Sequence, residues 1–376
     1  MSSETGTASV RILYIDDDPD RSAALFRQHF SRIEVLNTND SDFLQKLENE
    51  ATRADIIVTD YDLKDTLRSA GAALYPRDGQ ALNEVIDSMM RRLTRKAVFT
   101  IYSAQLSRIP GLEKLDGVPH LQARKLGVVL VGTKHRPEEF MRRLAVVADG
   151  LKQVKGWVPN RGTTLRELFV PALRIPDDAA WREDAIIEVE RFRPPVQEME
   201  EREDKAAFLS WLALEIFPYP TFLIGLEHVA LALRVDPDWL DKAISKRGDE
   251  ILRELEGVRY KGILADLEGP RWWRVGLNQE LWKATRQRPW DRETLGGIVK
   301  TWFGEDVRLI EQPDPVLLYD EFGRTTKDVA DVSETVRFMP SGWPAPAPWP
   351  SARIDEIKND DVWRQLVVPE DERRLA

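Results

Sequence analysis

The 376-residue chain contains no cysteine and only four histidines, and these absences exclude several kinds of site. Without thiols it can form no disulfide, no cysteine nucleophile and no cysteine-ligated metal centre. The histidines, His29, His120, His135 and His228, do not have the spacing of a zinc cluster. The chain also lacks the GxxxxGK[ST] and GxGxxG phosphate-binding loops and the GxSxG elbow. No familiar enzyme site is therefore evident.

Long apolar runs are also missing, and no stretch approaches twenty consecutive apolar residues. The first ten residues, MSSETGTASV, have neither the basic start nor the apolar stretch of a signal peptide. An apolar content of 42% with 31% charged residues is typical of a soluble globular protein. We expect a cytoplasmic protein that does not associate with membranes.

Positive charge is scarce overall, since the formal net charge is −10. Almost all of the excess acid follows residue 150, because the first 150 residues hold 21 basic and 22 acidic side chains. Surfaces that bind duplex DNA usually need a basic excess to neutralise phosphates. The totals therefore disfavour a nucleic-acid partner, although a local basic patch would escape them.

The first 155 residues alternate short β-rich runs with helical stretches. The runs are Arg11–Ile15, Arg32–Leu36, Asp55–Thr59, Ala97–Ile101 and Val128–Val131, and the helical stretches are Pro19–Phe30, Asp42–Glu50, Gln80–Thr94 and one from Pro137 to Gly156. Such alternation predicts an α/β fold with a doubly wound, five-stranded parallel sheet.

Composition changes after this region, because all twelve tryptophans lie at or after Trp157. We expect a mainly helical α+β region here. The predicted parts are a receiver-like domain over 1–155, a proline-containing connector over 156–200, a Trp-rich output domain over 201–340, and a proline-rich strap with a tail over 341–376. The strap sequence SGWPAPAPWP predicts extended, polyproline-like chain.

Residues 225–248 have the pattern of a helix, a turn and a second helix, and residues 258–277 have that of a β-hairpin. Together they suggest a winged helix, which would bind DNA. Against this stands the acidic start of the second helix: Asp236, Asp238 and Asp241. If Trp272 and Trp273 alternate along a strand, one ring faces the core and the other faces outward.

The segment RILYIDDDPD carries four carboxylates directly after an apolar run. Asp18 as the N-cap, Pro19 as the first helical residue and Asp20 in the first turn would explain two of them. Asp16 and Asp17 remain unexplained, although clustered carboxylates repel one another unless something binds them.

The ends of the other predicted strands supply a reason, because ligands collect beyond the carboxyl ends of parallel strands. The third, fourth and fifth runs lead to Asp60, Ser103 and Lys134. Carboxylates and waters suit an octahedral Mg²⁺ ion, which would relieve the repulsion between Asp16 and Asp17. Asp60 could then attack a phosphoryl group, with Ser103 and Lys134 stabilising its oxygens.

The motifs LYIDDDP, ADIIVTDYDL, DGQALNEVI, a strand ending in Ser103, and VGTK occur in this order. In that order they resemble the receiver domain of two-component response regulators, over roughly residues 9–155. The resemblance implies Asp60 as the phosphoacceptor, Asp16 and Asp17 with Asp60 as the Mg²⁺ ligands, Ser103 as the switch hydroxyl and Lys134 as the phosphoryl contact. It also implies a histidine kinase or another phosphodonor as a partner.

The sequence departs from the receiver pattern at several places. His135 follows the lysine where the family usually has proline, and Val131 stands where an aromatic switch residue is expected. The segments 63–77 and 105–126 are also extended, so we expect phosphorylation to be felt there.

We expect an atypical response-regulator-like protein whose phosphorylation controls an output region acting through protein–protein contacts. The alternatives are a DNA-binding regulator with a winged-helix output and a degenerate, unphosphorylated receiver used as a docking module. Beyond receiver self-phosphorylation and dephosphorylation, the sequence indicates no enzymatic activity.

Overall fold

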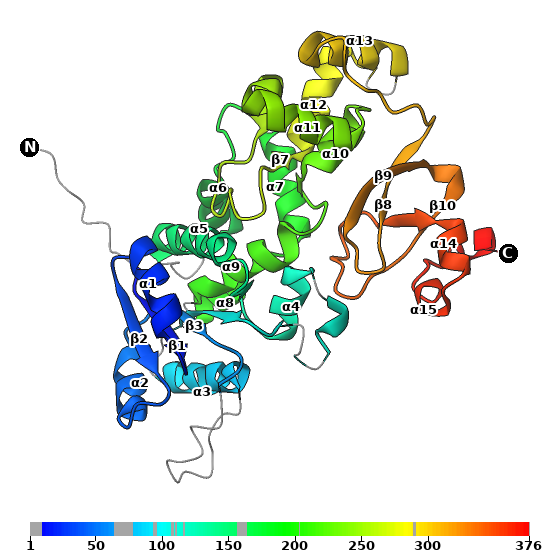
Figure 1. Cartoon of the computed structure of the whole chain (residues 1–376). Coiled ribbons are helices and arrows are strands. Elements are labelled where there is room, and N and C mark those ends of the chain that lie inside the picture. Colours follow the sequence, from blue (N-terminus) through cyan, green and yellow to red (C-terminus); the bar gives the residue numbers. More distant parts are fainter. Residues whose placement is uncertain are drawn as a thin grey trace, which may run out of the picture. The chain divides into compact units, whose positions relative to one another are not determined.

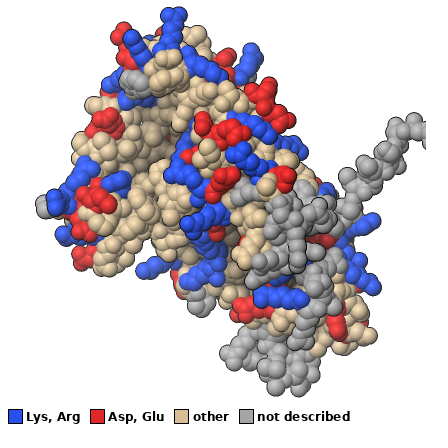
Figure 2. Space-filling view, turned by 180° about the vertical axis from the view of Figure 1, so that it is seen from behind, with Lys and Arg blue, Asp and Glu red and all other residues tan. Residues whose placement is uncertain are grey.

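The chain forms two compact units in the computed structural model (Figure 1). The structure describes residues 10–63, 78–92, 96–106, 109, 111–115, 117–155, 164–202, 204–288 and 291–375. The first unit comprises Met1–Ala172 and Pro194–Leu214, and the second comprises Leu173–Arg193 and Glu215–Ala376. Basic and acidic side chains are interleaved over much of the face shown in Figure 2. No helix in the described part of the chain is long and apolar enough to cross a membrane.

The first unit is built on a five-stranded parallel sheet, as predicted. Its strands are β1 (Ile12–Asp16), β2 (Ile33–Asn37), β3 (Ile56–Thr59), β4 (Val98–Ser103) and β5 (Leu130–Thr133). The strand order is β2-β1-β3-β4-β5, and all four pairings are parallel. This is the flavodoxin-like, doubly wound order, with its switch point between β1 and β3.

Helices cover both faces of this sheet (Figure 1). They are α1 (Asp20–His29), α2 (Phe43–Ala51), α3 (Gly79–Arg92), α4 (Pro119–Lys125) and α5 (Pro137–Lys155). Side chains alternate along β1, so Leu13 and Ile15 pack in the core with residues of α2 and α3. On the other face, Tyr14 stacks on Phe26 of α1 at 4.5 Å between ring centroids.

The start of α1 differs from the sequence prediction. Pro19 occupies the N-cap position and the helix begins at Asp20, so Asp18 does not cap it. Instead, the backbone amide of Asp18 donates a hydrogen bond of 2.9 Å to Asp16 Oδ1. The tight turn after β1 thus provides a hydrogen bond to the Asp16 carboxylate and no side-chain cap for the helix.

The first unit also includes helices from later in the chain. They are α6 (Leu165–Leu173, of which the last residue falls in the second unit), α8 (Val196–Arg202) and α9 (Lys205–Trp211). A π-helical turn, Leu212–Ile216, follows α9, and its last two residues fall in the second unit. Asp204 caps α9 by accepting a hydrogen bond from the Ala207 amide. Helix α9 packs against α5, so this unit is completed only by residues far beyond the sheet.

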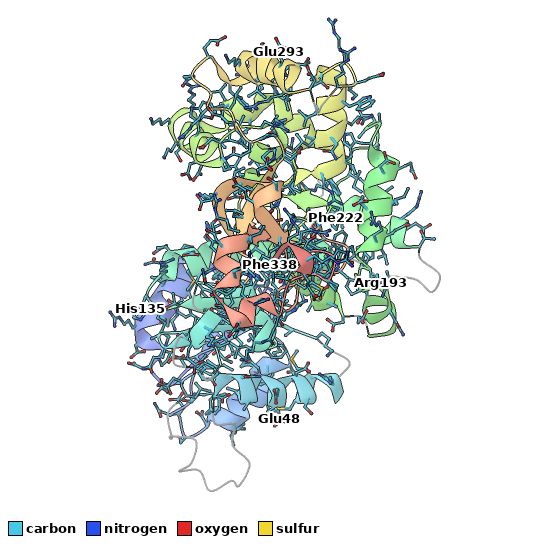
Figure 3. All side chains as sticks on the ribbon, turned by 90° about the vertical axis from the view of Figure 1, so that its right-hand side faces the viewer. Glu48, His135, Arg193, Phe222, Glu293 and Phe338 are labelled. Carbon is cyan, nitrogen blue, oxygen red and sulfur yellow. The ribbon has the colours of Figure 1, made fainter. Side chains whose placement is uncertain are left out.

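The second unit is mostly helical around an aromatic core. Its helices are α7 (Arg182–Arg191), α10 (Leu226–Ala232), α11 (Pro237–Arg247), a 3₁₀ segment (Gly248–Val258), α12 (Arg274–Ala284) and α13 (Arg292–Phe303). Strands β6 (Leu223–Ile224) and β7 (Trp272–Trp273) pair antiparallel. Trp273 stacks on Phe222, which Figure 3 labels, at 5.7 Å.

Two sequence predictions fail around β7. Trp272 and Trp273 are both buried, at 0% and 1% exposed, because packed elements cover both sides of this two-residue strand. The predicted hairpin is reduced to one antiparallel bridge between Arg259 and Trp272, and α12 begins at Arg274, where the second hairpin strand was expected to continue. The helix-turn-helix of α10 and α11 is present, but the described residues 258–277 form no extended hairpin after it.

The C-terminal part of the second unit contains a four-stranded sheet in the order β10-β11-β8-β9. Its elements are β8 (Pro315–Tyr319), β9 (Thr325–Asp331), β10 (Thr335–Arg337), β11 (Ser351–Arg353), α14 (Ile354–Lys358), α15 (Asp361–Arg364) and the 3₁₀ turns Val332–Glu334 and Glu372–Leu375. Phe338, labelled in Figure 3, is buried against Trp363.

The proline-rich stretch 341–350 is not the extended chain that we expected. It folds into turns, with the Trp343 amide donating to Pro340 O at 3.2 Å and the Ala347 amide donating to Pro344 O at 2.9 Å. Trp343 also donates from Nε1 to Pro348 O, which closes the turns on themselves. Its ring packs on Tyr219 at 5.0 Å, so burial of tryptophan outweighs the polyproline preference of the sequence.

Candidate functional site

Three carboxylates meet at the carboxyl end of the parallel sheet. Asp16 is the last residue of β1, Asp17 follows it, and Asp60 follows β3. Each offers an oxygen, and these three oxygens lie within 4.8 Å of one another. Asp16 and Asp60 are buried and Asp17 is half-buried. The structure thus brings together the acidic triad that the strand ends predicted.

The chain around Asp60 is held closely in place. Its amide donates to Ile15 O at 2.9 Å, and its Oδ1 accepts a hydrogen bond of 3.3 Å from the Asp62 amide. Gly79, at the start of α3, packs so closely that a Cβ there would lie 2.0 Å from Asp60 O. The Gly79 amide donates to Tyr61 O. The glycine of the DGQALNEVI motif is therefore a packing requirement of this site.

Lys134 supplies the positive charge of the site. Its Nζ lies 2.6 Å from Oδ2 of Asp16 and 2.6 Å from Oδ2 of Asp60. Burial lowers the pKa of Lys134, but the hydrogen bonds to the two carboxylates outweigh burial and raise the pKa above its ordinary value. The ammonium group therefore stays charged and bridges β1 and β3 from the end of β5.

Asp16 has three hydrogen-bond donors. Burial raises its pKa, but the bonds from Lys134, from the Tyr14 hydroxyl and from the Asp18 amide together hold the pKa below its ordinary value. Asp16 is consequently an ionised carboxylate although it is fully buried. An ionised, fixed carboxylate is what a metal ligand requires.

Tyr14 is a site residue that the sequence reasoning missed. It lies two residues before Asp16 on β1, so both side chains project from the same face of the sheet, and its hydroxyl bonds to Asp16 Oδ2. Burial and then the Asp16 charge raise the pKa of Tyr14. Tyr102 and Phe140 stack on each other at 4.5 Å between ring centroids, and both contact Phe26, the ring on which Tyr14 stacks. The period-two spacing of Tyr14 and Asp16 was the available signal.

Ser103 lies at the end of β4, where the sequence placed it. It is buried, and its Oγ is 3.5 Å from the Gln105 amide that donates to it. In the sheet it pairs with Thr133, and its carbonyl accepts a hydrogen bond from the Lys134 amide at 3.1 Å. Ser103 is therefore tied to Lys134 through the backbone.

The two extended segments flank these residues in sequence. Of the segment 63–77, only Leu63 lies within the described residues, where it is buried. The segment 105–126 is described in large part and contains a 3₁₀ turn, Glu113–Leu115, and α4. The chain thus passes directly from Ser103 into this second segment.

The chemistry of the donor set is that of a hard cation. Three carboxylate oxygens in one cluster, two of them on buried residues, can hold a metal ion of the Mg²⁺ or Ca²⁺ type, which prefers oxygen ligands. In this structure the Lys134 ammonium compensates part of the negative charge of Asp16 and Asp60.

Comparison of the chain with protein-family models, with curated proteins and with solved structures finds no match. The receiver-like character of the first unit therefore rests on two structural features, the β2-β1-β3-β4-β5 topology and the triad of Asp16, Asp17 and Asp60.

Proposed function

We propose that the first unit accepts a phosphoryl group on Asp60 in a Mg²⁺-dependent reaction and so acts as an atypical response regulator. The observation that carries this proposal is the convergence of the acidic triad with Lys134, whose Nζ contacts both Asp16 and Asp60. A carboxylate cluster with one fixed ammonium suits a reaction in which negative phosphoryl oxygens arrive beside a carboxylate nucleophile.

The step is a phosphoryl transfer. An Asp60 carboxylate oxygen attacks the phosphorus of a small or protein phosphodonor, the bond from phosphorus to the leaving group breaks, and the leaving group departs with the electron pair. Mg²⁺ held by Asp16, Asp17 and Asp60 would neutralise charge on the transferred group. Lys134 would exchange its contact with Asp60 for one with a phosphoryl oxygen, and Ser103 would donate its hydroxyl to another.

The test is phosphorylation by acetyl phosphate in the presence of Mg²⁺, followed by intact-mass spectrometry of the full chain. We expect one phosphoryl adduct on the wild-type protein and none on Asp60→Asn. The matched control is Asp62→Asn, which removes an exposed carboxylate two residues away and should label normally. A folded wild-type protein that takes up no phosphoryl group would leave only the degenerate-receiver interpretation.

We further propose that the remainder of the chain transmits this modification through protein–protein contacts. Support comes from its acidic excess and from the exposed apolar side chains of the second unit, among them Ile187, Trp282 and Val362. The phosphodonor in a cell would be a histidine kinase or another phosphorylated partner.

A DNA-binding output is the second candidate, and one observation favours it. Helices α10 and α11 follow β6, and Arg259 then bridges to Trp272 of β7, which is an order of elements found in winged helices. Charge disfavours it, because Asp236 caps α11, Asp238 is exposed and Asp241 pairs with Lys327 of β9 at 2.8 Å. A salt-dependent mobility-shift assay on random duplex separates the two candidates, and we expect no shift at physiological ionic strength.

A further inference from the structure

A cavity lies in the first unit, next to the two neighbours of Lys134 in the chain, Thr133 and His135. It has a volume of about 460 Å³, within the range of roughly 300–1,000 Å³ usual for small-molecule sites. Its wall follows β5 and the first turns of α5, with Ala104 from the end of β4 and Pro119 from α4. All of its lining residues belong to the first unit.

The sequence departures from the receiver pattern meet in this cavity. Val131 and His135 both line it, where the receiver pattern has a large aromatic ring and a proline. The Val131 side chain is smaller than an aromatic ring, and it also belongs to the buried cluster around Ile101 and Leu112. His135 is exposed at the rim and is labelled in Figure 3. Val131 and His135, the two departures from the receiver pattern at this end of the sheet, thus line the same cavity.

The floor of the cavity is apolar and firmly packed. Val131 and Phe140 are buried, and the Phe140 ring stacks on Tyr102 at 4.5 Å. Gly132 meets the same ring so closely that a Cβ would lie 2.0 Å from it. Phe140 is therefore held in one position, and the cavity does not depend on a mobile side chain. Such a floor suits a flat or aliphatic apolar group.

The walls of the cavity carry a positive balance. Two guanidinium groups line it, those of Arg136 and Arg143, against the single carboxylate of Glu139. Arg143 is only 8% exposed, so its charge acts in a largely desolvated position, where it is screened less. Arg136 is exposed and lies 3.8 Å from Glu139.

From these features we infer that the cavity binds a small organic anion, a carboxylate or phosphate attached to an apolar group. The apolar part lies on Val131 and Phe140, and the anionic part lies toward Arg143 and Arg136. This site is distinct from the acidic triad and does not depend on phosphorylation of Asp60.

The test uses 1-naphthoate as the anionic probe and 1-naphthylmethanol as its neutral counterpart, with the full chain and ligand-observed NMR titrations. We expect saturable binding of naphthoate, and binding of the neutral probe that is weaker by about tenfold or more, because a charge-assisted hydrogen bond is lost. No saturable naphthoate binding, or equal binding of the two probes, would overturn the inference.

Variants locate the probe. Val131→Phe fills the cavity and should abolish binding, whereas Val85→Phe adds the same ring at an exposed position of α3 and should not. Arg136→Gln should weaken naphthoate binding several-fold. Its control is Arg27→Gln, which removes the same charge at an exposed position of α1 and should leave binding unchanged. Unchanged binding by Val131→Phe would place the probe elsewhere.

Asp60→Asn should bind naphthoate as the wild type does. This measurement tests the cavity separately from the proposed phosphoryl chemistry. Phosphorylation can fail while the cavity still binds naphthoate, and naphthoate binding can fail while Asp60 is still phosphorylated. Loss of naphthoate binding in Asp60→Asn would contradict a separate site.

Discussion

Asp16 is a fully buried carboxylate that accepts three hydrogen bonds, and its surroundings explain how a buried acid stays ionised. A buried charge is costly unless hydrogen bonds and opposite charge compensate it. Asp16 receives both, from Lys134, from the Tyr14 hydroxyl and from the Asp18 amide. Its position is thus set before any ion arrives, which lowers the ordering cost of binding one.

The first prediction concerns Tyr14. Tyr14→Phe removes only the hydroxyl, and we expect the free energy of unfolding to fall by about 1–2 kcal/mol, because the hydrogen bond to a charged acceptor is lost. Urea unfolding measures this change.

A double-mutant cycle with Asp16→Asn assigns the loss to the pair. Strict additivity of Tyr14→Phe and Asp16→Asn would show that the hydroxyl does not act on Asp16, and that the effect comes from the aromatic cluster around Phe26 instead.

The second prediction concerns the metal. Mg²⁺ should raise the thermal stability of the wild type, by roughly 1.4 kcal/mol at ten times its dissociation constant. Asp17→Asn should weaken this gain, because the cluster loses a ligand and a negative charge, and it should also stabilise the metal-free form by relieving repulsion. Thermal melts with and without Mg²⁺ measure both effects.

Asp18→Asn is the matched control for this substitution. Its side chain is exposed, and it lies outside the triad. Its Mg²⁺ response should equal that of the wild type. A wild-type melting temperature that does not change with Mg²⁺ would mean that the acid cluster is only a strand-to-helix loop.

At the level of secondary structure, close backbone packing joins α3 to β3. Helix α3 begins at Gly79, directly against the carbonyl of Asp60, so Asp60 and the start of the helix hold each other in place. A similar contact joins β5 to α5, where Gly132 meets Phe140. In both places a missing side chain allows an element to approach the sheet end.

The third prediction follows from this contact. Gly79→Ala places a Cβ 2.0 Å from Asp60 O, where backbone must move, and we expect destabilisation of about 1–3 kcal/mol with loss of phosphoryl uptake. Gly297→Ala in α13 is the control, since a Cβ there meets no atom within 4 Å. It should stabilise the helix by about 0.5–1 kcal/mol. Equal effects of the two substitutions in chemical unfolding would contradict the packing argument.

At the scale of the whole molecule, the chain crosses between its two units three times. The first unit is left after Ala172, entered again at Pro194 and left finally after Leu214. Within the returning segment Pro194–Leu214, helix α9 packs on α5, and Leu214 contacts the core cluster that contains Ile101 and Val131. Leu214 comes after Leu173–Arg193, the first stretch of the second unit. The core of the first unit is therefore completed by a residue from beyond that stretch.

The fourth prediction concerns how phosphorylation is transmitted. Charge added at Asp60 affects a segment only if that segment interacts differently with the two states. We expect beryllofluoride to change hydrogen exchange more in 63–77 and 105–126 than in the strand at 128–131. The first segment follows Asp60 closely, and the second follows Ser103.

Mass-spectrometric exchange of the full chain measures this response, and Asp60→Asn should show none. Changes confined to 128–155, with both extended segments silent, would mean that the signal passes through β5 and α5 alone, as in receivers that have an aromatic switch residue.

The sequence alone determined the parallel sheet and the acidic triad. Both follow from local regularities: strand runs of Val and Ile alternate with helical stretches, and parallel strands bring Asp16, Asp17 and Asp60 to one edge whatever the loops do. Lys134 was located by the same reasoning. For these residues the order along the chain is nearly the order in space.

Only the tertiary structure decided the rest, because those features depend on contacts between distant segments. Trp272 and Trp273 are both buried because β7 pairs with β6, about fifty residues earlier, and packs against α12 and the 3₁₀ segment Gly248–Val258. The proline-rich stretch is folded into turns because the Trp343 ring packs against the rings of Tyr219 and Tyr319. The bond from Tyr14 to Asp16 and the cavity beside Val131 likewise require packed neighbours, which local pattern does not specify.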